Sequence, residues 1–132
     1  MLTPLQPGEP STVDVLEGET PRYTATVTDD TGAPLPAASL STLTMTLYVL
    51  KSDGTTSYIR GSGLGGQNVL NANNVTVSTD GSVVWSLQVA DTSLVEAVPF
   101  EKHIALWEWT WPTARAGKHE VWFNVKALNE VP

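Results

Sequence analysis

The sequence predicts an all-β fold, a sandwich of about seven or eight short antiparallel strands in two packed sheets. Three observations lead to this prediction. Apolar and polar residues alternate with a period of two in several segments, as they do in strands with one buried face. Turn sequences that contain Asp and Gly separate these segments. The chain has 132 residues and no cysteine, so it is the size of one domain that buries a core without disulfides.

The N-terminal part predicts an arm followed by two strands. The first ten residues contain three prolines and one glycine. Proline lacks a backbone donor and disfavours helix in the residue before it, so we expect an extended arm over residues 1–11. Strand Thr12–Leu16 comes next. A further strand, Arg22–Thr28, alternates threonine with Tyr23, Ala25 and Val27.

Two central segments show the clearest alternation. Thr42–Leu50 places four apolar residues on one face and threonine with Tyr48 on the other. Gly81–Val89 groups Val83, Trp85, Leu87 and Val89. Both patterns are typical of half-buried strands. Turns are predicted at residues 30–34, 52–54 and 79–81, where Gly supplies positive φ and Asp bonds the local backbone.

Two segments interrupt the strand pattern. Gly61–Asn68 is rich in glycine and predicts a mobile loop. Ala90–Ala97 is the one helical candidate, a single turn capped by Asp91 or Ser93 and ended by Pro99.

The last hairpin is the best defined. His103–Trp111 is expected to pair with Lys118–Lys126 across residues 112–117. On the second strand Trp122 faces away from the apolar side chains. Together the strands predict an immunoglobulin-like sandwich over residues 12–132, without the cysteine pair of antibody domains.

The first strand of this hairpin carries three of the five tryptophans at every second position. Trp107, Trp109 and Trp111 therefore share one face. One indole buries on the order of 200 Å², and a small sandwich does not easily enclose three in a row. Three interpretations stay open: all three belong to the core, Trp109 or Trp111 contacts another chain, or the row stacks on a sugar.

Composition excludes several classes of function. Fourteen acidic against seven scattered basic residues give a net charge of −7, which argues against nucleic-acid binding. No apolar run approaches the roughly 20 residues that span a bilayer, and the N-terminus does not resemble a signal peptide. We therefore expect synthesis in a cytoplasm without export by that route.

The sequence offers no catalytic, cofactor or metal site. His103 and His119 fall at distant positions of the hairpin, and Glu101 with His103 predicts a polar cluster at a strand edge. The acidic turns at Asp29–Asp30, Asp53 and Asp80 would bind calcium only if they converged, and no EF-hand spacing occurs. No nucleophile elbow or P-loop is present, so we expect a protein that is not an enzyme.

Several segments resemble the small structural proteins of tailed-bacteriophage virions. Residues 18–34 and 43–55 are similar to the opening of upper-baseplate domains, with an Asp-Gly-type turn in each. Later segments are similar to small proteins from phage head and neck gene clusters: residues 68–71, 75–77, 81–85, 87–91, 103–110 and 116–123. The long Gly61–Asn74 excursion departs from the baseplate-type domains.

The resemblance implies a non-enzymatic, multi-copy virion protein that decorates or stabilises the capsid or the head–tail neck through contacts with other phage proteins. Made in the host cytoplasm, it would reside in the virion. A baseplate or tail module, a host-surface carbohydrate-binding module and an accessory domain of an enzyme are the alternatives. The residues we expect at partner contacts are Leu2, Pro4, Leu5, Pro7, Pro10, Trp109, Trp111 and Trp122.

Overall fold

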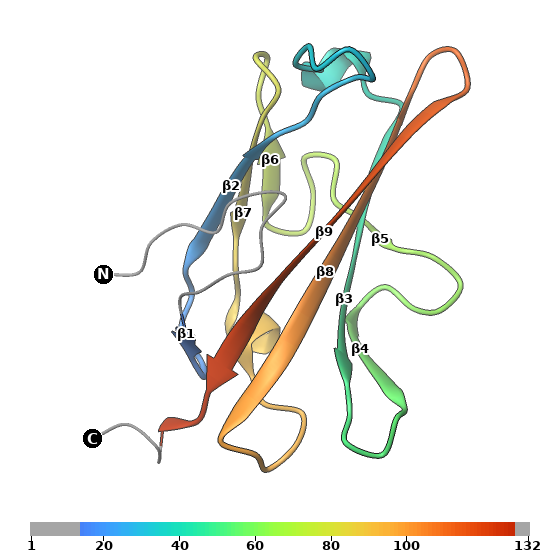
Figure 1. Ribbon diagram of the computed structural model, residues 1–132. Helices are drawn as coiled ribbons and strands as arrows, with labels where there is room; N and C mark the ends of the chain where they lie inside the picture. Colours follow the sequence, from blue (N-terminus) through green and yellow to red (C-terminus); the bar gives the residue numbers. More distant parts are fainter. Residues whose placement is uncertain (1–13, 129–132) are drawn as a thin grey trace.

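The computed structural model describes residues 14–128, and the described chain is a two-layer β-sandwich (Figure 1). The strands are β1 (Asp14–Leu16), β2 (Arg22–Thr26), β3 (Thr42–Leu50), β4 (Thr56–Arg60), β5 (Gln67–Asn68), β6 (Val75–Val77), β7 (Ser82–Ser86), β8 (Phe100–Trp111) and β9 (Arg115–Lys126). Two short 3-10 helices, η1 (Ala37–Ser39) and η2 (Val89–Thr92), connect them. The prediction of an all-β sandwich is confirmed.

The two sheets differ in size. The larger sheet has the order β1-β9-β8-β3-β4, with β5 also paired to β3. The smaller sheet has the order β2-β7-β6. This division matches the immunoglobulin-like arrangement, in which sequence neighbours β2 and β3 lie in opposite sheets.

One pairing corrects the antiparallel prediction. Strand β1 pairs with β9 in parallel, with Val15 opposite Val125. Both Gly18, at φ +80°, and Glu19 belong to the turn that takes the chain from β1 to the other sheet. Strands β1 and β2 therefore do not form a hairpin. Instead β1 pairs with the edge of β9, and all the elements between them in the sequence connect these two parallel strands.

The core lies between the sheets. Its largest fully buried side chains are Trp85, Tyr23, Phe123, Leu43, Met45 and Leu47. The buried apolar residues form one cluster to which both sheets contribute. The apolar faces predicted for residues 42–50, 81–89 and 118–126 point inward in β3, β7 and β9. Val89 is the exception: the alternation predicts it on the inward face, but β7 ends at Ser86, and Val89 lies in η2 and is 57% exposed.

Two local predictions need correction. The segment predicted as a loop, Gly61–Asn68, ends in strand β5, and its tip is closed by a hydrogen bond from the Ser62 amide to the Gly65 carbonyl, 2.9 Å long. The helical turn begins earlier than expected and is capped by Gln88, with Asp91 bonding back to the Gln88 amide. Within residues 14–128 no helix is long and apolar enough to cross a membrane.

Candidate functional site

Trp107 belongs to the core. It is 4% exposed and stacks on Tyr23 with ring centroids 5.6 Å apart and an interplanar angle of 18°. Trp85 contacts it edge-on at 5.8 Å. Burial in this aromatic group raises the pKa of the Tyr23 phenol well above its ordinary value. Trp107 is therefore not available to a partner.

Trp109 links the two sheets on the side of the sandwich formed by β2 and β9. The ring is half-buried against the core, and its Nε1 donates a 3.1 Å hydrogen bond to the Thr28 carbonyl that follows β2. The indole lies against Gly117 of β9, where a Cβ would come within 2.6 Å of the ring carbon Cζ2. This residue has a structural role in its own chain, and only part of its ring is left for a partner.

The other predicted contact residues do not form one surface. Trp111 is half-buried beside Trp109 at the end of β8. Trp122 lies on the opposite face of the same sheet, where the Lys102 Nζ is 4.1 Å from its ring centroid. The predicted contacts in the arm, Leu2, Pro4, Leu5, Pro7 and Pro10, lie outside the described residues.

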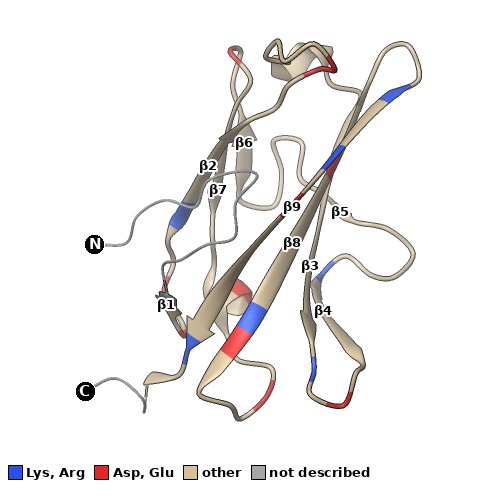
Figure 2. Cartoon of the chain, in the orientation of Figure 1, with Lys and Arg blue, Asp and Glu red and all other residues tan. Residues whose placement is uncertain are grey.

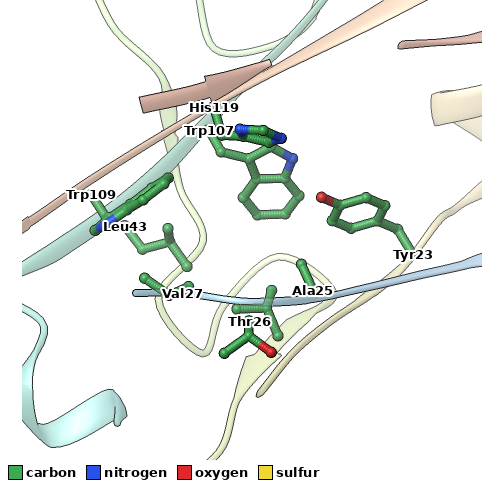
Figure 3. A pocket seen from close by; sticks show the side chains of 9 residues that line it. Tyr23, Ala25, Thr26, Val27, Leu43, Trp107, Trp109 and His119 are labelled. Atoms are coloured by element: carbon green, nitrogen blue, oxygen red, sulfur yellow. The ribbon is translucent and has the colours of Figure 1, made fainter. Parts of the chain in front are cut away.

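A small cavity opens between β2 and β9 beneath Trp109 (Figure 3). Its volume is about 40 Å³, and its lining is Tyr23, Ala25, Thr26, Val27, Leu43, Val83, Trp107, Trp109 and His119. Two buried nitrogens nearby, Trp107 Nε1 and His119 Nε2, have no hydrogen-bond partner among the described residues. Drug-sized ligands occupy pockets of roughly 300–1,000 Å³, so this cavity is too small for such a ligand.

A buried polar network holds the β7–β8 connection. Arg60 donates from Nε and Nη2 to the two carboxylate oxygens of Asp91, each at 2.7 Å. The His103 ring bonds the Asp91 carbonyl at 2.9 Å and Glu101 Oε1 at 2.8 Å. Glu101 also accepts from the amides of residues 95 and 96.

This network corrects the prediction of a strand-edge cluster, because Glu101 and His103 are buried. The network ties loop 88–99 to β4 and β8, and Arg60 Nη1 also donates to Gln67 Oε1 and to the Asn73 carbonyl. Sequence analysis missed the pairing of Arg60 with Asp91, since two residues 31 positions apart carry no local signal of contact.

The acidic turns do not converge. Asp29 follows β2 and Asp80 lies between β6 and β7, and these two turns are at one end of the sandwich; the turn between β3 and β4, which contains Asp53, is at the other end (Figure 2). Hydroxyl and amide donors of the same turn lower the pKa of each: Thr31 for Asp29, Thr55 for Asp53, and Ser78 and Ser82 for Asp80. Over residues 14–128 no group of three or more His, Asp and Glu side chains is arranged to hold a metal ion.

The outward face of the larger sheet carries a groove that sequence analysis did not find. Its volume is about 360 Å³, and Thr46, Tyr48, Thr56, Tyr58, Ser62, Gly63, Gly65, Leu106 and Glu108 line it. Tyr58 belongs to β4, which sequence analysis did not identify as a strand. The groove and the tryptophan row lie on opposite faces of β8.

The chain matches no protein-family model, no curated protein and no solved structure.

Proposed function

We propose that this chain is a non-enzymatic structural protein of a tailed-bacteriophage virion. It is an immunoglobulin-like domain that decorates or stabilises the capsid or the head–tail neck through contacts with other virion proteins. The resemblance of residues 18–34, 43–55 and 103–110 to phage proteins suggests the virion. The geometry of the sandwich supports binding to a protein partner.

The observation that carries the proposal is the open side of the sandwich. Within residues 14–128, strand β2 pairs only with β7, and β9 pairs with β1 only over residues 124–126. Along residues 115–123 the outer side of β9 thus pairs with no other described strand. Free strand edges are templates for pairing with another chain. Trp111, half-buried at the same end, adds apolar surface to this edge.

A second surface lies at the end of the sandwich where β3 finishes and β8 begins. Four apolar side chains there are 39–59% exposed: Leu50, Val95, Phe100 and Leu128. Hydrogen bonds hold the segments together, from the Ala127 amide to the Pro99 carbonyl and from the Ser52 amide to Glu96. A protein with two separate contact surfaces can bridge neighbours in a lattice, and each bound copy then stabilises the assembly by mass action.

The test uses particles of the encoding phage that lack this protein. Purified protein is added back, and bound copies are counted by quantitative mass spectrometry of the washed particles. We expect the wild type to bind and Trp111→Ala to bind less, since truncation removes apolar surface from the open side. Tyr58→Ala, on the opposite face of the sheet, is the matched control and should bind as the wild type does. Failure of the folded wild-type protein to bind any particle would overturn the proposal.

The same experiment separates the possible locations. A protein of the neck ring is present in few copies and a capsid coat in many. Binding to isolated tails rather than to heads would favour the baseplate or tail alternative.

A further inference from the structure

The outer groove is built by a loop that stands on the face of a sheet. Residues of β3 and β8 form its floor, and the segment from Ser62 to Gly65 forms one wall. Tyr58 of β4 and Tyr48 of β3 lie beside each other, with ring centroids 6.2 Å apart and an interplanar angle of 45°. These two rings give the groove its aromatic surface.

Glycine residues allow the loop to lie in close contact with the face of the sheet. A Cβ on Gly66 would come within 3.0 Å of the Thr44 side chain, and a Cβ on Gly63 within 3.2 Å of the Tyr58 hydroxyl. Side chains at these positions would push the loop off the sheet or fill the groove. The wall therefore depends on the glycine-rich composition of residues 61–66.

The polar lining is rich in hydroxyl groups. Thr46, Thr56 and Ser62 contribute aliphatic hydroxyls, which can donate or accept. The one carboxylate in the lining is Glu108, and Lys118 Nζ lies 3.3 Å from its Oε2. Next to the groove, the Tyr48 hydroxyl donates to Glu120 Oε2 at 3.3 Å. Lys118 offsets the charge of Glu108, and no other charged side chain of residues 14–128 lines the groove, so its lining suits a neutral ligand that bonds hydroxyl groups.

We propose that this groove binds a neutral saccharide of about two sugar rings. The volume of about 360 Å³ falls in the range of ligand pockets. The C–H face of a pyranose would lie on the Tyr58 ring, because aromatic faces are electronegative and C–H groups slightly positive. The sugar hydroxyls would bond the threonine and serine hydroxyls and the Glu108 carboxylate.

This location differs from the tryptophan row, where sequence analysis placed the sugar-binding alternative. On the tryptophan side the cavity is only about 40 Å³ and its lining is mostly apolar. On the outward side Leu106 and Glu108, from the same strand β8, face hydroxyls and tyrosine rings. The proposal does not depend on the virion assignment, because the groove and the open side use different residues.

The first experiment measures binding of soluble neutral disaccharides to the full chain. Maltose, cellobiose, lactose and chitobiose are titrated into the ¹⁵N-labelled protein while amide shifts are followed by NMR. We expect at least one sugar to shift the amides of residues 46, 58 and 62–65 in a saturable way. Tyr58→Ala should weaken that binding about tenfold, the loss expected when one stacked ring is removed.

Two further variants keep the test independent of folding. Gly63→Val places a side chain in the groove without removing a binding group and should also weaken binding. Trp111→Ala leaves the groove intact and should bind the sugar as the wild type does. Thermal unfolding of each variant confirms that it is folded.

Several outcomes would overturn the proposal. One is that no sugar of the panel shifts these amides. Another is that Tyr58→Ala and Gly63→Val bind as well as the wild type, or that Trp111→Ala abolishes binding. A short lysine-containing peptide that saturates the groove more tightly than every sugar would show that the ligand is a protein segment. None of these results bears on particle binding, which is measured separately.

Discussion

At the scale of single residues, Trp109 and Gly117 depend on each other. The indole occupies the space that a Cβ on Gly117 would need. We expect Gly117→Ala to lower the free energy of unfolding by about 1–3 kcal/mol, the usual cost of overpacking. Urea denaturation followed by tryptophan fluorescence measures this change. Ala116→Ser, at the exposed neighbouring position, is the control and should change stability by less than about 0.5 kcal/mol. Equal stability of the two variants would contradict the close packing of the ring.

Two of the ion pairs among the described residues should differ greatly in energy. Arg60 and Asp91 are buried with a bidentate contact, whereas Arg115 and Asp30 are exposed and 3.3 Å apart. Asp91→Asn leaves a buried guanidinium without its counter-charge and should cost about 3–5 kcal/mol. Asp30→Asn should cost less than about 1 kcal/mol. Chemical denaturation of both variants at neutral pH checks this contrast, and similar losses in the two would show that the Arg60 site is solvated.

The turn carboxylates give a prediction for low pH. Hydrogen bonds from Ser78 and Ser82 lower the pKa of Asp80 to about 2. An unfolded aspartate titrates near pH 4, so the stabilisation is present above that pH and is lost as the pH falls toward 2. Ser78→Ala should raise the pKa of Asp80, which ¹³C NMR titration of the carboxyl carbon detects. Thr79→Ala removes a neighbouring hydroxyl and should leave the titration unchanged; an equal shift in both variants would rule out the specific hydrogen bond.

At the scale of elements, the strands differ in how completely they are paired. Strand β8 bonds β3 on one side and β9 on the other, whereas β4 and β6 lie at sheet edges. Amide hydrogen exchange should therefore be slowest in β8 and faster in β4 and β6, because edge amides that point away from the sheet open more easily. Native-state exchange followed by NMR measures this order. Exchange of β8 as fast as that of β4 would contradict the central position of β8.

The same comparison explains which elements the sequence predicts. Strands β3, β8 and β9 are nine or more residues long and alternate along most of their length, so their pattern is visible without the structure. Strand β4 places the charged Arg60 in a buried position, where Asp91 neutralises it, and the apolar pattern is lost. Strand β5, with two residues, is too short to show a period. The parallel pairing of β1 depends on a partner more than 100 positions away.

The candidate sites were less predictable than the strands. The alternation of β8 placed Trp107, Trp109 and Trp111 on one side, and the structure confirms that arrangement of faces. The hydrogen bond from Trp109 to Thr28 joins residues 81 positions apart and has no local signal. The outer groove needs β3, β4, β8 and a folded loop at once, so it exists only in the assembled sandwich.

At the scale of the whole molecule, one core unites both sheets. Buried residues from β1, β2, β3, β7, β8 and β9 belong to a single cluster. Small domains with one core unfold in an all-or-none transition. We expect far-ultraviolet circular dichroism and tryptophan fluorescence to give the same midpoint in urea. Two separate midpoints would mean that the sheets unfold independently.

The parallel pairing of β1 with β9 has a mechanical consequence. These strands come from opposite ends of the described chain, and their backbones run in the same direction along residues 14–16 and 124–126. A force that pulls the two ends apart acts along the strands and stretches all their hydrogen bonds together, including the 2.9 Å bond from the Glu17 amide to the Lys126 carbonyl. In an antiparallel pair at the same place, the force would act across the strands and break their hydrogen bonds one after another. The domain is thereby suited to withstand tension between its termini.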